Sequence, residues 1–169
     1  LLEPFARDNP KIRARLQQTL TEILPQAPIE QALQIALTAR VLETEVSHGL
    51  LKTIAARYDT SALMRDAALS SIGGEELIFM RKLLASPAWQ SQAPSREIFL
   101  EMLTGAIVRK RDPAELKTLL AMIEVDKNYF GWREKTILTG MSIQGFSGKI
   151  KPVQLKEAPA ILSRKDLGV

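Results

Sequence analysis

The chain has 169 residues, of which 46% are apolar, 25% are charged and 5% are aromatic, and its formal net charge is +4 at pH 7. This length suffices for a single domain with a hydrophobic core, and the charge is too small to indicate nucleic-acid binding by itself. The lack of cysteine excludes disulfides, thiolate metal sites and covalent haem attachment within these residues, and no apolar run approaches the roughly 20 residues that cross a bilayer.

The first part of the chain predicts helices separated by proline-containing breaks. Its opening residues are typical of the end of a helix, and without an initiator methionine or a signal peptide we expect the chain to be part of a longer protein. Asn9 and Pro10 predict a helix start, with asparagine as the cap. A linker at residues 25–28 then precedes helices over residues 29–42 and 44–58. The positions predicted to be buried are Ile12, Leu16, Leu20, Ile23, Leu24, Leu33, Ile35, Ala36, Leu37, Val41, Val46, Leu50, Leu51, Ile54 and Ala55.

Residues 59–87 predict an αα-hairpin of two short amphipathic helices. Asp59 is the expected cap of the first helix, and Gly73 is expected to take the left-handed conformation that ends it. Glu75 and Glu76 fall in the first turn of the second helix, where negative charge is favourable. The apolar faces comprise Leu63, Met64, Ala67, Ala68, Leu69, Ile72, Leu77, Ile78, Met80, Leu83 and Leu84. Because so short a pair cannot bury both faces alone, the hairpin needs neighbouring helices.

The second half of the chain predicts three longer helices and a less regular end. Ser95 and Asp112 are expected to cap the first two helices, and the third begins near Tyr129. Residues 151–169 form a less regular extension, with one short helix near residues 155–163. The inward positions are Ile98, Phe99, Met102, Leu103, Ala106, Ile107, Leu116, Leu119, Leu120, Ile123, Trp132, Ile137, Leu138 and Met141.

Four helical segments share an arginine followed by an apolar face, which indicates an internal repeat. These segments begin at Arg13, Arg65, Arg96 and Arg133, and the last three recur roughly 30 to 40 residues apart, as helical-pair repeats do. No segment alternates with period two for long enough to predict a strand. The predicted fold is therefore all-α, with one domain over residues 1–169: a HEAT/armadillo-like right-handed superhelix of antiparallel helix pairs.

The polar residues indicate no reaction centre. His48 is the single histidine, and because Glu45 and Lys52 do not complete a metal site, we expect it on the surface of its helix. Ser70 and Ser71 have no nearby base and no glycine elbow, so close helix packing explains them better than nucleophilic catalysis. Adjacent acidic residues are explained by helix-start electrostatics, because neighbouring side chains of a helix diverge. We expect no catalytic, cofactor-binding or metal-binding residue in this segment.

A basic run and three aromatic residues are the candidates for contact with a partner. The residues are Trp89, Arg109, Lys110, Arg111, Tyr129 and Trp132. The three basic residues form the densest positive run, although cations at a helix C-terminus are also favoured by the helix dipole. The aromatic residues lie near predicted loops, where such side chains can anchor a contact. For Trp132, closing the core of its own repeat is an equally good interpretation.

The chain contains the segments RDAALSSI, RDPAELKTLLAMI and WREKTILTGM, followed by KPVQLKEAPAIL after a glycine-containing stretch. These segments resemble the HEAT-repeat region of large bacterial membrane-bound dehydrogenases. The resemblance runs from about Asn9 to Leu162 and is clearest from Arg57 onward. Its motifs belong to the helical scaffold, and none is catalytic. Proteins of that family join a sugar-dehydrogenase-like β-propeller to HEAT repeats and to a c-type cytochrome module with a Cys-x-x-Cys-His motif.

The resemblance implies an exported, periplasmic parent that oxidises a sugar or alcohol and passes electrons to haem c. Because this chain has no cysteine, the haem must lie elsewhere in the parent, and no residue here matches the quinone or calcium site of a propeller. The implied function of this segment is that of a non-catalytic scaffold that spaces the redox modules. Its expected partners are the flanking domains or another protein, with no nucleic acid and no transmembrane segment.

The alternative is a HEAT-like nucleic-acid-binding protein or DNA glycosylase, because such solenoids can hold a duplex in a basic groove. That function needs lysine and arginine converging on the concave face, with a carboxylate and aromatic side chains nearby. Here 23 basic residues are spread among 19 acidic ones, which argues against it. Of the three functions considered, that of a free-standing enzyme is the least favoured by the sequence.

Overall fold

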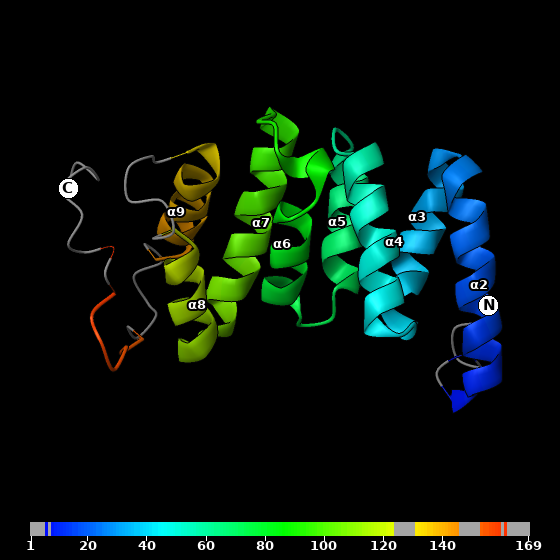
Figure 1. Cartoon of the computed structure of the whole chain (residues 1–169), viewed down its shortest axis with the longest axis horizontal. Helices are drawn as coiled ribbons and strands as arrows, with labels where there is room; N and C mark the ends of the chain where they lie inside the picture. Colours follow the sequence, from blue (N-terminus) through cyan, green and yellow to red (C-terminus); the bar gives the residue numbers. More distant parts are fainter. Residues whose placement is uncertain (1–5, 7, 124–130, 146–152, 160, 162–169) are drawn as a thin grey trace. The chain divides into compact units, whose positions relative to one another are not determined.

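The computed structural model of the chain describes residues 6, 8–123, 131–145, 153–159 and 161. Within these residues it contains eight α-helices, three short 3₁₀ helices and no strand (Figure 1), so the prediction of an all-α fold is confirmed. The α-helices are α2 (Pro10–Ile23), α3 (Ile29–Thr38), α4 (Thr44–Arg57), α5 (Ala62–Ser71), α6 (Glu76–Leu84), α7 (Pro94–Lys110), α8 (Pro113–Ile123) and α9 (Trp132–Gly145). The 3₁₀ helices are η1 (Leu24–Gln26), η2 (Ala39–Val41) and η3 (Pro87–Trp89).

The chain forms two compact units, Leu1–Ser91 and Gln92–Val169. The first contains α2 to α6, and the second contains α7 to α9. None of the helices in the described residues is long and apolar enough to cross a membrane.

Short polar side chains begin two of the helices as predicted. The Asn9 carboxamide oxygen accepts from the backbone N–H groups of Lys11 and Ile12, at 3.0 and 3.2 Å, and thereby starts α2. Asp112 caps α8 in the same way, accepting from Ala114 and Glu115 at 2.8 and 3.1 Å. Both caps satisfy N–H groups that have no partner inside the helix.

Two other predicted caps are wrong. The cap of α5 is Ser61, whose hydroxyl accepts from the backbone N–H of Met64 at 3.4 Å, and not Asp59. Helix α7 begins one residue before the expected cap, because Pro94 supplies a preset first turn and Ser95 is already helical. Its N-cap, Ala93, makes no side-chain cap. In both cases a residue one or two positions away from the predicted cap provided an equally good start signal.

Within the first unit, the packing of α3 to α6 includes contacts both between consecutive helices and between alternate ones. Helix α4 packs on α3 and α5, while α3 packs on α5 and α4 on α6. The core side chains that this arrangement buries completely or nearly so include Leu51, Ile54, Met64, Phe79, Met80, Leu83 and Trp89. Leucine, isoleucine and methionine thus form most of the core, with Phe79 and Trp89 as its large aromatic members.

The end of α4 holds the linker between α2 and α3. The Arg57 guanidinium donates to the backbone carbonyl oxygens of Leu24 and Pro25, at 3.1 and 3.0 Å, and lies over the Tyr58 ring at 5.1 Å. The Tyr58 hydroxyl donates to the carbonyl oxygen of Ala27 at 2.9 Å. These bonds satisfy carbonyl groups of a segment whose prolines interrupt the helical ladder.

The turn between α5 and α6 consists of two glycines in left-handed backbone conformations. Gly73 has a φ of 70° and Gly74 a φ of 95°, which residues with a Cβ adopt only at a steric cost. The predicted role of Gly73 is confirmed.

In the second unit, α7 and α9 are packed most closely where small residues meet. A Cβ added to Gly140 on α9 would lie 2.8 Å from the Thr104 Cβ and 3.0 Å from the Glu101 carbonyl oxygen on α7. The Thr104 hydroxyl is fully buried and donates to the carbonyl oxygen of Leu100 at 2.8 Å. Glycine is therefore required at this crossing by the proximity of the neighbouring backbone. The remaining core residues include Phe99, Leu100, Leu103, Ile107, Leu116, Leu119, Ile123 and Ile137.

Several apolar positions predicted to face inward are exposed. Leu63 is 60% exposed, Ile78 50% and Ile98 45%, and Leu37 and Ile23 are also on the surface. Helical periodicity predicts a broad apolar stripe, whereas only the part of it that meets a neighbouring helix is covered. Isolated surface leucine and isoleucine residues are ordinary in soluble proteins.

The C-terminal predictions are tested only in part. Residues 153–159 are not helical, so the helix expected near residues 155–163 does not begin there. Pro159 removes a donor and restricts the residue before it, which disfavours a helix in this segment. The expected helix start near Tyr129 lies outside the described residues, in which α9 begins at Trp132.

Candidate functional site

The largest change from the sequence prediction concerns His48. His48 is only 3% exposed to solvent, so the prediction of a surface histidine is wrong. The ring lies edge-on to Phe79 of α6, with the ring centroids 5.3 Å apart and an interplanar angle of 72°. Burial of this polar side chain from α4 against α6 requires polar partners for the ring nitrogens.

Both ring nitrogens of His48 have such partners. The Nδ1 atom lies 3.4 Å from the Lys82 Nζ, and the Nε2 atom lies 3.3 Å from a Glu75 carboxylate oxygen. Because an ammonium group only donates, Nδ1 must accept, which places the proton of the neutral ring on Nε2, facing Glu75. One neutral tautomer therefore suits both neighbours.

The cluster extends to the surface through charged side chains. Lys82 also donates to Glu45 at 2.7 Å, and the Thr44 hydroxyl lies 3.5 Å from the second oxygen of Glu75. We call Thr44, Glu45, His48, Glu75 and Lys82 the His48 cluster. It joins the beginning of α4 to α6 and the residue that precedes it.

Burial and charge together set the protonation of the His48 cluster. Burial lowers the pKa of His48, the positive charge of Lys82 lowers it further, and the carboxylates of Glu75 and Glu45 offset this only in part. The hydrogen bond and charge of Lys82 lower the pKa of Glu45. His48 is thus held neutral at a pH where Lys82 and Glu45 carry opposite charges.

The geometry argues against catalysis by the His48 cluster. A general base needs a free nitrogen within reach of a substrate proton, whereas both nitrogens of His48 face side chains of the same chain and the ring is covered. Across the described parts of the chain, no group of three histidine, cysteine or acidic residues could hold a metal ion. The cluster therefore acts as a polar contact between two helices.

This cluster was not predicted from the sequence, because its members come from two different helices. The three residues at the beginning of α4 were visible as neighbours, but nothing in the spacing connected them with Glu75 and Lys82. A single histidine among leucine and isoleucine positions of an amphipathic helix was the available signal for burial. That signal does not name the partner.

The other acidic and hydroxyl candidates are dispersed. Glu43 contacts the Arg13 guanidinium at 3.0 Å, while its near neighbour Glu45 pairs with Lys82. Ser70 donates to the carbonyl oxygen of Ala67 at 2.9 Å, and Ser71 is buried at 3% exposure. These positions do not converge on a common point.

The six residues proposed as partner contacts lie in different environments. Trp89 is fully buried in the core of the first unit, so in this structure its side chain is not available to a partner. Trp132 is half-buried, with the Arg133 guanidinium over its ring at 5.6 Å. Tyr129 lies outside the described residues.

The basic run ends α7. Arg109 is exposed, Lys110 forms an ion pair with Glu115 at 2.6 Å, and Arg111 has a left-handed φ of 57°. Arg109 and Lys110 occupy the last turn, where the helix dipole favours cations. Glu115, the partner of Lys110, lies in the first turn of α8.

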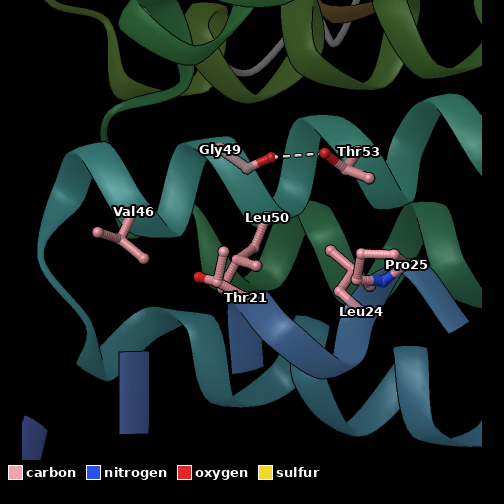
Figure 2. Close-up of a pocket in the computed structure, with 7 residues that line it drawn as sticks. All are labelled: Thr21, Leu24, Pro25, Val46, Gly49, Leu50 and Thr53. Atoms are coloured by element: carbon pink, nitrogen blue, oxygen red, sulfur yellow. Dashed lines mark hydrogen bonds between the residues drawn. The ribbon is translucent and has the colours of Figure 1, made fainter. Parts of the chain in front are cut away.

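A shallow hollow of about 390 Å³ lies between α2, η1 and α4 (Figure 2). It is lined by Thr21, Leu24, Pro25, Val46, Gly49, Leu50 and Thr53. Both threonine hydroxyls are already used within their own helices: Thr21 donates to the carbonyl oxygen of Gln17 at 2.8 Å and Thr53 to that of Gly49 at 3.0 Å. The hollow thus offers apolar surface and no charged group for chemistry.

Comparisons of the chain with models of protein families, with curated proteins and with solved structures found no match. The resemblance to the dehydrogenase HEAT region therefore stays a prediction.

Proposed function

We propose that this chain is a non-catalytic helical-repeat segment of HEAT type that holds other domains or proteins in position. The observation that carries the proposal is the packing of alternate helices: α3 on α5 and α4 on α6 in the first unit, and α7 on α9 in the second. Stacked helical pairs make such contacts when each repeat buries its apolar face on the next. This packing favours a repeat scaffold over a helical bundle that encloses a ligand.

The state of the polar groups supports a scaffold. The His48 cluster is covered and its ring nitrogens face partners within the chain, and the hollow beside α4 has no free charged group. Enzyme sites instead direct several titratable groups towards an accessible space. Neither the His48 cluster nor the hollow beside α4 forms an arrangement of that kind.

We further propose, on the resemblance alone, that the parent is an exported bacterial dehydrogenase in which this segment spaces redox modules. Its partners are then the flanking domains of the same chain, and haem c belongs to one of them. Transfer between modules depends on their separation, so a stiff helical segment would contribute by fixing that separation. The flanking sequence tests this parentage directly, because it must contain a Cys-x-x-Cys-His motif and an export signal.

The scaffold function is tested in the full-length protein by changing chemistry and geometry separately. A triple variant with His48→Gln, Glu75→Gln and Lys82→Met removes the titrating groups of the cluster, and Lys117→Met serves as a control. We expect dye-linked oxidation of sugars or alcohols, per folded molecule, to be equal in the wild type and in both variants. Loss of activity in a triple variant with a native far-UV circular dichroism spectrum contradicts a non-catalytic function.

Replacement of the whole segment by a flexible glycine-serine linker of equal residue number tests the geometric part. Such a linker fluctuates as a random coil and fixes no distance. We expect the flanking modules to stay folded and to keep their separate half-reactions, while electron transfer between them becomes slower. Unchanged transfer would show that the segment does not position these modules.

A further inference from the structure

One contact of the His48 cluster between α4 and α6, that of Lys82 with His48, exists only while the histidine is neutral. The Lys82 ammonium donates to Nδ1 across 3.4 Å, and this bond requires the lone pair on that nitrogen. A second proton on the ring would place two donors opposite each other in a buried position. Lys82 has another acceptor at 2.7 Å, Glu45, on the exposed side of the cluster.

We propose that His48 makes the packing of α6 on α4 dependent on pH, because a proton on Nδ1 displaces Lys82 towards Glu45 and loosens α6. The edge-on contact with Phe79, itself fully buried, couples the ring position to the core of the first unit. A displaced ring would therefore disturb apolar packing as well as a hydrogen bond.

The charged groups around the ring are few. Glu45 comes from the same helix as His48, Lys82 comes from α6, and Glu75 is the residue that precedes α6. Besides α6, helix α4 contacts α2, η1, α3, η2 and α5, and among the described residues none of these elements brings a charged side chain that acts on His48. The response thus depends on the balance between one ammonium and two carboxylates.

The direction of the pH effect follows from the lowered pKa of His48. In the unfolded chain the histidine titrates near its ordinary value of 6.5, whereas in the folded chain it titrates lower. As the pH falls below 6.5, the unfolded state takes up the proton first, so the free energy of unfolding decreases. The contribution is fully present above pH 6.5 and is lost as the pH falls through the folded-state pKa.

The single histidine of the chain allows a direct test by NMR. We expect imidazole carbon and nitrogen shifts to report a proton on Nε2 at pH 7.5 and a pKa below 6.5. A proton on Nδ1 at neutral pH, or a titration at or above 6.5, would overturn the proposal. This measurement uses the wild-type chain and does not depend on any variant being stable.

Lys82→Met tests the contribution of the ammonium group. We expect the pKa of His48 to rise relative to the wild type, because a positive neighbour is removed and Glu75 remains. The matched control is Lys117→Met, since Lys117 also pairs with an exposed glutamate at 2.7 Å, Glu157, but lies in the other unit. An equal His48 pKa in the wild type and in both variants overturns the proposal.

Hydrogen exchange tests whether the titration reaches the helix. After correction for intrinsic exchange rates, we expect amide protection in residues 76–84 to fall between pH 7.5 and pH 5.0 in the wild type and to stay constant in His48→Gln. Residues 113–123 of α8 provide the internal reference. Protection of α6 that falls equally in wild type and His48→Gln shows that other groups cause the change, and it overturns the proposal.

Discussion

Ser71 is a buried residue whose hydroxyl has no hydrogen-bond partner among the described residues. Its neighbour Ser70 already occupies the nearby carbonyl oxygen of Ala67. Because an unsatisfied buried hydroxyl is unfavourable, we expect Ser71→Ala to stabilise the protein by about 1 kcal/mol in urea unfolding. Ser70→Ala, at an exposed position, should change the free energy of unfolding by less than about 0.5 kcal/mol. A destabilised Ser71→Ala variant would mean that the hydroxyl has a partner outside the chain, such as water.

Arg111 ends α7 with a left-handed φ of 57°, where glycine is the usual residue. We expect Arg111→Gly to stabilise the protein by about 0.5–1 kcal/mol, since a left-handed side-chain residue costs roughly 1–2 kcal/mol and the added freedom of glycine offsets part of the gain. Thermal unfolding measures the change.

The reverse substitution controls for this interpretation. A Cβ at Gly73 would meet nothing within 4 Å, so Gly73→Ala adds backbone strain without a clash. It should destabilise the protein by about 1 kcal/mol. Equal stability of Gly73→Ala and wild type would contradict the assignment of strain at both positions.

Residue-scale predictions from sequence succeeded where the signal was local. Asn9 and Asp112 cap helices through bonds to the next two or three residues, and Gly73 adopts the conformation that only a glycine accepts readily. His48 and Trp89 were placed wrongly or left undecided because their burial depends on distant helices. Contacts with distant helices cannot be predicted from the residues that are neighbours in sequence.

The crossing of α7 and α9 depends on one glycine. We expect Gly140→Ala to destabilise the protein by about 1–3 kcal/mol, because the new Cβ would lie within 3.0 Å of Thr104 and of the backbone of α7. Denaturant unfolding measures the change. The helical Gly49 is the matched control, since it is exposed and a Cβ there meets nothing within 4 Å.

Gly49→Ala should stabilise the protein by about 0.5–1 kcal/mol, because alanine favours the helix and no neighbour opposes it. If both glycine variants gain stability, the close approach of α7 and α9 is not maintained in solution.

The positions of the helices along the chain were predicted well from the sequence. The faces that each helix buries were predicted less well. The helical pattern found all eight helices of the described residues to within a few positions, because capping residues, prolines and apolar periodicity act within one helix. Leu63, Ile78 and Ile98 show the limit. Their exposure depends on the angle at which the next helix packs.

For the molecule as a whole, the charge distribution predicts no strong affinity for nucleic acid. The net charge is +4, and Arg13, Lys82, Lys110 and Lys117 each pair with a glutamate. We expect fluorescence anisotropy at physiological salt to show no binding to duplex DNA tighter than ~1 µM. Tighter binding that weakens steeply with added salt would favour the nucleic-acid alternative over a scaffold.

The all-α class was predictable, but the His48 cluster was not. Composition and periodicity set the fold class, since they describe an average over many residues. The cluster depends on five particular side chains brought together by the packing of α4 with α6. The sequence by itself does not determine which residues of α4 lie opposite which residues of α6.

The glycine turn between α5 and α6 also has a practical consequence. Gly73 and Gly74 are exposed and have open space where a side chain would be, and tips of this kind tolerate inserted residues. The first unit therefore offers an attachment point for a fluorophore or a short tag, immediately before Glu75. A reporter placed there would allow any movement of α6 to be followed optically in real time.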